Sequence, residues 1–288
     1  MRDLNYQLKK LCSHCREGSY ATQNKRERML TLMANQLHAL GYRGMTTRSL
    51  KPKHVEALVK LWFDQGLSSG TLKNRMAAIR WWAQKVDKQN VVARSNEHYG
   101  IPDRRFVTNA SKAKTVTRAE LDKVRDEHVR MSLELQQAFG LRREEAIKFQ
   151  PSFADRGDHL VLKASWTKGG RERTIPIHTE AQRDVLNRAR RLAGLGSLIP
   201  SNRNYVQQLR VYEGNTLRAG LHHMHGLRHA YAQNRYEELT GWQAPAEGGP
   251  NAKTLTAEQR ETDRQARLTI SRELGHEREQ ITAAYLGK

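Results

Sequence analysis

The 288-residue sequence contains only two cysteines, Cys12 and Cys15, and no long apolar run. Two cysteines cannot form the disulfide network on which small secreted domains depend, so we expect a protein of the reducing cytoplasm. The mean hydropathy is −0.80, and neither a secretory signal nor a stretch able to cross a bilayer is found in the sequence. A membrane role is therefore not expected.

Acidic side chains are also in short supply, with 30 Asp and Glu against 50 Lys and Arg, which gives a formal net charge of +20. The resulting pI of about 10.2 reflects a larger surplus than solubility requires, and it indicates a polyanionic partner, with nucleic acid as the first candidate. Charge identifies the partner but not the reaction. A basic protein that binds RNA or ribosomes without catalysis stays open at this point.

The first third of the chain has the apolar periodicity of amphipathic helices. Helices are predicted around residues 29–40, 55–62 and 72–86, the last with Ser68 or Ser69 as its N-cap. The polar face of the third predicted helix is either a solvated surface or a contact with the DNA backbone, and with this net charge we favour DNA contact. The residues predicted to make it are Lys73, Asn74, Arg75 and Arg80.

Composition suggests two domains joined by a polar, basic linker. We expect a helical DNA-binding domain at 1–105, the linker at 106–116 and a second domain at 117–288. The second domain opens with Thr117-Arg118-Ala119-Glu120, which has the form of a capping box. Two short strands are predicted at 159–166 and 173–177, joined by a turn at 168–171. The stretch 241–268, polar in its first half, is predicted to be a surface insertion.

Residues suited to DNA strand transfer are ordered along the second domain. A strand can be cut and rejoined without ATP only if a nucleophile keeps the phosphodiester energy in a covalent bond, while cations stabilise the phosphorane. Arginine suits this task because its planar fork donates two parallel hydrogen bonds and stays protonated. The motifs are Gly140-Leu141-Arg142-Arg143-Glu144-Glu145, Thr167-Lys168-Gly169-Gly170-Arg171, His225-Gly226-Leu227-Arg228-His229, Gly275-His276, and Tyr285 nine positions later.

This ordered set resembles the signature of the tyrosine recombinase (phage integrase) family, which has Gly-Leu-Arg-x-x-Glu, a lysine in a β-turn, His-x-x-Arg-His, Gly-His and a later tyrosine. The resemblance implies a mainly α fold with a small β-sheet, in which a helical core-binding (SAM-like) domain precedes an α+β integrase-type catalytic domain. It also implies a site-specific DNA recombinase that forms a 3′-phosphotyrosyl intermediate and needs neither metal nor other cofactor. The alternatives are a type IB topoisomerase-like enzyme and a catalytically inactive DNA-binding protein.

Residue roles follow from the resemblance, position by position. It implies that Arg142 and Arg228 clamp the scissile phosphate. His225 and His276 would hydrogen-bond to the phosphate or handle protons, and Lys168 would protonate the leaving 5′-oxygen.

The same resemblance makes Tyr285 the nucleophile and Glu145 a supporting residue. A free phenol has a pKa of roughly 10, so Tyr285 needs cationic neighbours or a base in order to attack at neutral pH. We assign the first arginine role to Arg142 and not to Arg143, because Arg142 directly follows Gly-Leu and precedes Glu145 by three positions. His229 is expected to be structural.

The partner implied by the family is double-stranded DNA, bound by a homotetramer on two synapsed sites and by a monomer or weak oligomer in the absence of DNA. The element served would be a mobile element or prophage. Two departures from the family pattern stand out. Arg228 and His276 are 48 positions apart, which suggests the insertion, and only three residues follow Tyr285. Many relatives have a C-terminal helix that docks on the neighbouring subunit, so we expect tetramer contacts here to be made differently or to be weaker.

Two further patterns have structural interpretations that we favour. Cys12-Ser13-His14-Cys15 resembles half of a zinc site, but no second ligand pair lies at a typical spacing, so no metal is predicted. Of Trp81 and Trp82, at least one is expected to pack in the helical core and not to stack on DNA.

Overall fold

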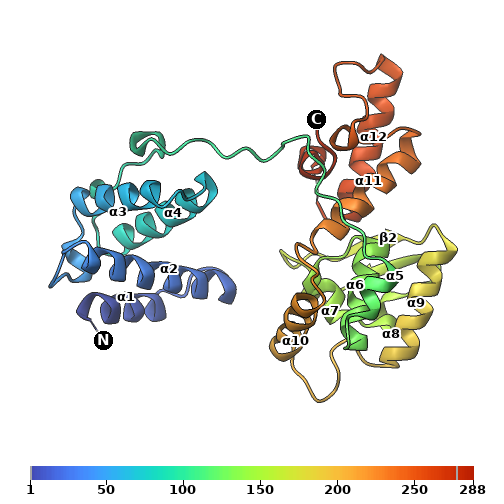
Figure 1. Ribbon diagram of the computed structural model, residues 1–288, viewed down its shortest axis with the longest axis horizontal. Coiled ribbons are helices and arrows are strands. Elements are labelled where there is room, and N and C mark those ends of the chain that lie inside the picture. The colour runs from blue at the N-terminus through green and yellow to red at the C-terminus, as the bar shows by residue number, and fades with distance from the viewer. Residues whose placement is uncertain (1, 277) are drawn as a thin grey trace. The chain divides into compact units, whose positions relative to one another are not determined.

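The computed structural model describes residues 2–276 and 278–288, and the chain divides into two compact units (Figure 1). Unit 1 is Met1–Arg105 and unit 2 is Phe106–Lys288. Within the described residues no helix is both long and apolar enough to span a lipid bilayer. The architecture is mainly helical with one small antiparallel sheet, as the family resemblance implies.

Unit 1 is a helical bundle of α1 (Asp3–His14), α2 (Tyr20–Ala39), α3 (Pro52–Asp64) and α4 (Ser69–Lys85). The predicted helices correspond to α2, α3 and α4, and the Ser68 hydroxyl caps α4 by accepting from the backbone N–H of Thr71. Helix α1 was not predicted, although Leu4, Leu8 and Cys12 recur every fourth residue and are buried in the same core as Trp82.

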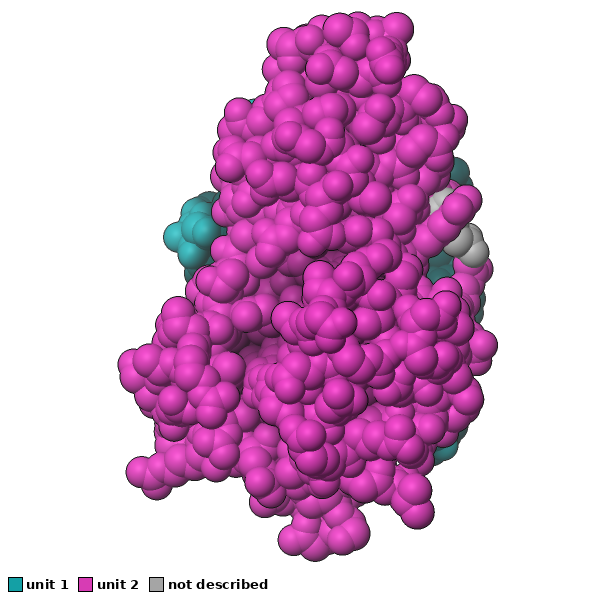
Figure 2. Space-filling model, turned by 90° about the vertical axis from the view of Figure 1, so that its right-hand side faces the viewer, with its two compact units in different colours: residues 1–105 teal, residues 106–288 magenta. Residues whose placement is uncertain are grey.

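Unit 2 consists of helices around a two-stranded sheet. The helices are α5 (Arg118–Asp122), α6 (Glu127–Phe139), α7 (Arg143–Lys148), α8 (Pro151–Ala154), α9 (Glu180–Ala193), α10 (Tyr205–Arg218), α11 (Gly226–Thr240), α12 (Ala257–Glu273) and α13 (Ala283–Leu286). The predicted capping box is present, because Thr117 and Glu120 bond reciprocally at the start of α5. Figure 2 shows one face of this unit, which is hollowed near its middle.

The sheet pairs β1 (His159–Leu162) with β2 (Arg173–Pro176) in antiparallel register, from His159 opposite Pro176 to Leu162 opposite Arg173. The first strand is shorter than predicted, because residues 164–166 form a 3₁₀ turn. That turn buries Trp166 against the rings of Phe149 and Phe153. Packing of this aromatic side chain therefore overrides its strand propensity.

Two elements that follow α11 bring the end of the chain back to the core of unit 2. Helix α12 begins inside the stretch 241–268 and packs along α11, with Ala266 and Ile270 buried (Figure 1). The short helix α13 also packs on α11, which places Tyr285 in the same core as Phe139 and Leu274. This return of the chain is what brings residues near 140, 228 and 285 together.

Candidate active site

The predicted catalytic residues of unit 2 occupy the ends of four helices and one turn. Arg142 is the N-cap residue of α7, and Arg228 lies in the first turn of α11, for which His225 is the N-cap residue. His276 follows α12, Tyr285 lies in α13, and Lys168 lies in the turn between β1 and β2. The predicted site thus combines residues that are up to 143 positions apart in the sequence.

Arg228 is the most deeply buried cation of the cluster, with 1% of its surface exposed. Its Nη1 donates to the carbonyl oxygen of Gly140 at 2.5 Å, its Nη2 donates to the carbonyl oxygen of Leu274, and its Nε donates to Tyr285 Oη at 3.2 Å. Burial and the charges of Arg142 and Arg173 lower the pKa of Arg228 to about 10, which still leaves it protonated at neutral pH. The predicted nucleophile is therefore in direct contact with one of the two predicted phosphate-binding arginines.

Gly140 is required at its position by both backbone and packing. Its φ is +59°, a conformation that residues with a Cβ rarely adopt, and an added Cβ would lie 2.5 Å from Cδ1 of Tyr231. This turn ends α6 and directs the Gly140 carbonyl to Arg228. The glycine of the Gly-Leu-Arg motif therefore positions the second arginine as well as the first.

Arg142 and Arg228 donate to the same backbone carbonyl oxygen, that of Leu274. The Nη2 of Arg142 donates to it at 3.2 Å and lies 3.5 Å from Nε2 of His276. The side chain of Arg142 is 18% exposed, whereas that of Arg228 is buried. Arg142 thus lies at the surface of the cluster, where it can reach a ligand.

Glu145 holds the other side of Arg142. Its buried carboxylate accepts from the Arg142 backbone N–H at 2.7 Å and from Arg142 Nη1 at 2.8 Å, and it also binds both Nη atoms of Arg173. Burial alone would raise the pKa of Glu145, but the hydrogen bonds and charge of Arg173, followed by the charges of Arg142 and Arg228, lower it to about 2. Glu145 is therefore an anion that braces the site, in keeping with its predicted supporting role.

Three imidazoles surround the Tyr285 ring. The ring centroids of His229, His225 and His276 lie 4.7, 6.1 and 6.2 Å from that of Tyr285. Burial, reinforced by nearby arginines, lowers the pKa of His225 and brings that of His276 to about 4. Burial and the neighbouring His225 bring the pKa of His229 to about 4 as well. All three rings are therefore neutral at pH 7 and can accept a proton.

Lys168 is exposed in the turn between β1 and β2. It lines an open hollow of about 690 Å³ together with Arg142, Arg173 and His276. A phosphate group that entered this hollow would meet Arg142, Lys168 and His276. The structure therefore brings five of the six predicted residues into one cluster, and Lys168 shares the hollow with two of the five, Arg142 and His276. His225, Arg228 and Tyr285 are not among the described residues that line the hollow.

The backbone on either side of Tyr285 is tied down by unit 2 itself. Gln233 Nε2 donates to the carbonyl oxygen of Tyr285 at 2.8 Å, and Arg267 Nη1 donates to that of Gly287 at 3.0 Å. Asn109 exchanges two hydrogen bonds with the backbone of Lys288. The phenol is thus presented to the arginines of the same chain.

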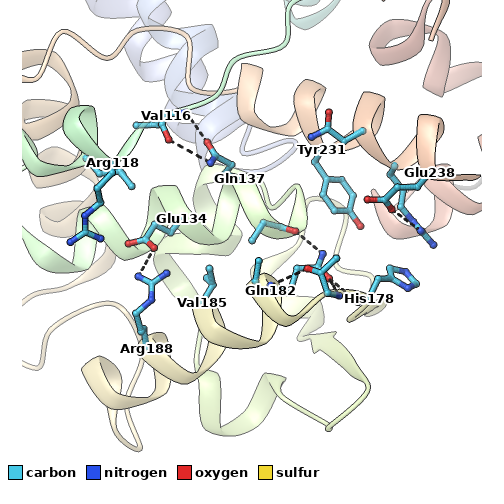
Figure 3. A pocket seen from close by; sticks show the side chains of 16 residues that line it. Val116, Arg118, Glu134, Gln137, His178, Gln182, Val185, Arg188, Tyr231 and Glu238 are labelled. Atoms are coloured by element: carbon cyan, nitrogen blue, oxygen red, sulfur yellow. Dashed lines mark hydrogen bonds and ion pairs between the residues drawn. The ribbon is translucent and has the colours of Figure 1, made fainter. Parts of the chain in front are cut away.

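A second hollow of about 480 Å³ lies between α6, α9 and α11 (Figure 3). Four of its charged side chains pair with one another, Arg188 with Glu134 and Arg235 with Glu238. None of the predicted catalytic residues lies among the described residues that line it. Three of them, Arg142, Lys168 and His276, line the hollow of about 690 Å³ instead.

The four predicted DNA contacts of unit 1 differ in their availability. Arg80 donates to the carbonyl oxygens of Ala93 and Ser95, and Arg75 is stacked 5.1 Å from the centre of the Trp62 ring. Both guanidinium groups thus serve the fold of unit 1. Asn74 is exposed, and Lys73, whose side chain is 25% exposed, pairs with the exposed Asp103 and not with the backbone or an aromatic ring of the core.

Two contributors to the site were not predicted from the sequence. Arg173 follows Lys168 by five positions and anchors Glu145, and the carbonyl oxygen of Leu274 joins Arg142 to Arg228. Every residue has a backbone carbonyl, so the role of this one cannot be predicted from residue type. The alternation of Arg173 with Ile175 in a predicted strand was a usable signal, because it places an arginine on the core-facing side, where it needs a carboxylate partner.

Comparison with known families gives two matches. A family model described as phage integrase, N-terminal, matches residues 1–92, and one described as integrase matches residues 103–234. The second match ends before His276 and Tyr285, so the place of these residues in the site rests on the geometry above. No curated protein matches the sequence.

Solved structures of DNA complexes share the fold at low sequence identity. A lambda integrase dimer bound to a COC′ core site is 15% identical, with a TM-score of 0.61 over 98% of this chain and 76% of that one. The Tn1549 transposon integrase in complex with circular intermediate DNA is 14% identical, with a TM-score of 0.57 over 100% and 96% of the two chains. The XerH site-specific recombinase bound to palindromic difH substrate is 16% identical, with a TM-score of 0.57 over 98% and 80%.

Proposed function

The chain belongs to the phage integrase family of tyrosine-type site-specific recombinases, and on this premise we propose that it cuts and rejoins DNA through a 3′-phosphotyrosyl bond to Tyr285. The observation that carries the proposal is the hydrogen bond from Arg228 Nε to Tyr285 Oη, in a cluster that also contains Arg142 and neutral histidines. A phenol beside a buried guanidinium has the electrostatic support that a nucleophile needs.

In the proposed reaction, Tyr285 Oη attacks the scissile phosphorus and the bond from phosphorus to the 5′-oxygen breaks. Arg142 and Arg228 stabilise the charge on the non-bridging oxygens of the phosphorane. The phenolic proton passes to a neutral imidazole, for which His225 and His276 are the candidates, and Lys168 protonates the leaving 5′-oxygen. A 5′-hydroxyl from the partner strand then attacks the phosphotyrosine and releases Tyr285, so the number of phosphodiester bonds is conserved.

The proposed substrate is duplex DNA carrying two sites that a tetramer brings together, in the service of a mobile element or prophage. The net charge of +20 supports the choice of a polyanion. A lambda integrase tetramer bound to a Holliday junction is among the structures that share this fold, with a TM-score of 0.57 and 14% identity.

The proposed function is tested with nicked suicide duplexes made from the DNA that flanks the gene. The protein is expected to form an adduct that survives SDS and that peptide mapping assigns to Tyr285. Two duplexes labelled at opposite ends should then yield recombinant products. An adduct without exchange would identify a topoisomerase-like activity, and the absence of both products would contradict the proposal.

Substitution of Lys73 tests the proposed DNA contact of unit 1. Lys73→Ala should weaken DNA binding and reduce the magnitude of the log–log salt slope by ~0.9, because the loss of one phosphate contact means that about one counterion fewer is released on binding. The matched control is Lys60→Ala. This variant also breaks an ion pair between a lysine and an aspartate, Lys60 with Asp64, but Lys60 lies on α3 and its loss should leave the salt slope unchanged. Dissociation constants measured over a salt series decide the matter. An unchanged slope for Lys73→Ala would place this face of α4 away from DNA.

The low pKa of His276 predicts an unusual pH profile for cleavage. A proton acceptor works in its neutral form, which is lost as the pH falls through its pKa. Burial, followed by the charges of Arg228, Arg142 and Arg173, holds the pKa of His276 at about 4, against the opposing effect of Glu145. The second-order rate of adduct formation, which reports the free enzyme, should therefore stay constant from about pH 7.5 to 5.5. If the proton acceptor were a histidine with its usual pKa, the rate would fall about tenfold over this range. Such a fall would contradict the assignment of His276 as the proton acceptor.

A further inference from the structure

Arg173 lies at the start of β2 and is not among the residues that the family motifs single out. Its side chain is 6% exposed, and both Nη atoms donate to the Glu145 carboxylate, Nη1 to Oε1 at 2.7 Å and Nη2 to Oε2 at 2.8 Å. A guanidinium that donates two parallel hydrogen bonds fixes both the position and the plane of a carboxylate. Arg173 therefore determines how Glu145 is oriented.

Glu145 transmits this orientation to Arg142. Its Oε1 also accepts from Arg142 Nη1 at 2.8 Å, and its Oε2 also accepts from the Arg142 backbone N–H at 2.7 Å. Each carboxylate oxygen thus binds Arg173 on one side and Arg142 on the other. Rotation of the carboxylate would break its bond to the Arg142 guanidinium, whose Nη2 faces His276.

Arg173 also supports the other components that line the hollow. The turn before His276 packs directly on it, because a Cβ at Gly275 would lie 2.8 Å from Arg173 Cδ and 2.9 Å from its Nη1, and the φ of Gly275 is +67°. Arg173 also belongs to the hairpin whose turn carries Lys168. These are packing contacts, whereas the hydrogen bonds of both Arg173 Nη atoms go to Glu145, so the specific link of Arg173 to the predicted catalytic residues runs through Glu145 to Arg142.

We propose that Arg173 is a positioning residue for DNA cleavage, which holds the guanidinium of Arg142 on the scissile phosphate by fixing Glu145. Arg173 lines the hollow, but its side chain is only 6% exposed and both Nη atoms bind Glu145, so the proposal assigns it no contact with DNA. The inference rests on the proposed function, since it assigns a task within the same cleavage step. Displacement of a reacting group by ~1 Å lowers a rate by about 10²-fold, so loss of this brace should be visible in the chemical step.

The first measurement is the single-turnover rate of adduct formation at saturating DNA. Arg173→Met removes the fork with little change in volume, and cleavage should slow by ~10- to 100-fold while the dissociation constant for DNA stays near that of the wild type. The matched control is Arg183→Met, which breaks another partly buried ion pair of unit 2, that with Asp155, outside the hollow. This control should cleave at the wild-type rate.

The decisive comparison is the double variant Arg142→Ala with Arg173→Met. A residue that acts only through Arg142 has nothing to position once that side chain is gone, so the double variant should be no slower than Arg142→Ala alone. A residue that supports the fold in general, or that binds DNA directly, would lower the rate by the product of the two single effects. A double variant whose cleavage rate is lowered by the product of the two single effects would therefore overturn the proposal.

A conservative variant keeps the test valid if Arg173→Met folds poorly. Arg173→Lys retains the charge but cannot make the fork, so its rate should lie between those of the wild type and Arg173→Met. A rate within about twofold of the wild type would show that the fork is not required and would overturn the proposal. If the wild-type protein forms no adduct, the proposed function is what fails; if the wild type cleaves and the Arg173 variants match it, only the role of Arg173 fails.

Discussion

Tyr285→Phe is expected to abolish the covalent adduct with a suicide duplex while DNA binding is retained. The phenolic oxygen is the only part of the side chain that can bond to phosphorus, and its removal leaves the ring to fill its place in the core of unit 2. The hydrogen bond from Arg228 Nε is lost, but Arg228 keeps its bonds to the carbonyl oxygens of Gly140 and Leu274. The measurement is the fraction of labelled DNA that remains bound to protein in SDS.

The matched control for this variant is Tyr212→Phe. Tyr212 is a buried tyrosine of unit 2 whose hydroxyl accepts a hydrogen bond from Gln136, in a hydrophobic cluster separate from that of Tyr285. Its substitution costs about one net hydrogen bond, ~1 kcal/mol of stability, and should leave the adduct yield unchanged. A Tyr285→Phe adduct equal to that of the wild type would show that another residue is the nucleophile.

The motif residues were predictable because their chemistry depends on residue identity. Arginines, histidines and a tyrosine in a fixed order are visible in a sequence, and the structure brings Arg142, Arg228 and Tyr285 within reach of one another. The place of Lys168 was not predictable, because a turn with two glycines can adopt many conformations. The resemblance predicts which residues form the site but not the contacts between them.

Supporting contacts were harder to predict because they depend on tertiary packing. Arg173 resembles any arginine of a polar hairpin until Glu145 is placed beside it, and the Leu274 carbonyl is independent of residue type. In unit 1 the same limit applies to Arg75 and Arg80, which are predicted to contact DNA: their partners within the fold, the Trp62 ring and the backbone carbonyl of Ala93, were not predicted. Helical periodicity identifies a polar face, but not which of its cations the fold itself uses.

The charge balance of the cluster explains why it suits a phosphate. One carboxylate, Glu145, is placed against the guanidinium groups of Arg142, Arg173 and Arg228, and the nearby imidazoles are neutral. Because water is largely excluded, this excess of positive charge is poorly screened and costs stability in the free protein. An incoming phosphodiester would relieve that cost, and the further charge of the phosphorane would be stabilised more strongly still.

Substitution of Arg142 should distinguish the role of this arginine in cleavage from that of the exposed Arg143 next to it. Arg142→Ala is expected to slow adduct formation by ~10²-fold or more, because it removes a preorganised donor for the phosphorane. Arg143→Ala is the matched control, since Arg143 is the adjacent residue, carries the same charge and pairs with Glu213 at an exposed site. Single-turnover rates at saturating DNA compare the two. Equal rates for the two variants would contradict the assignment of Arg142, and a slow Arg143→Ala with a normal Arg142→Ala would move the role to the neighbouring residue.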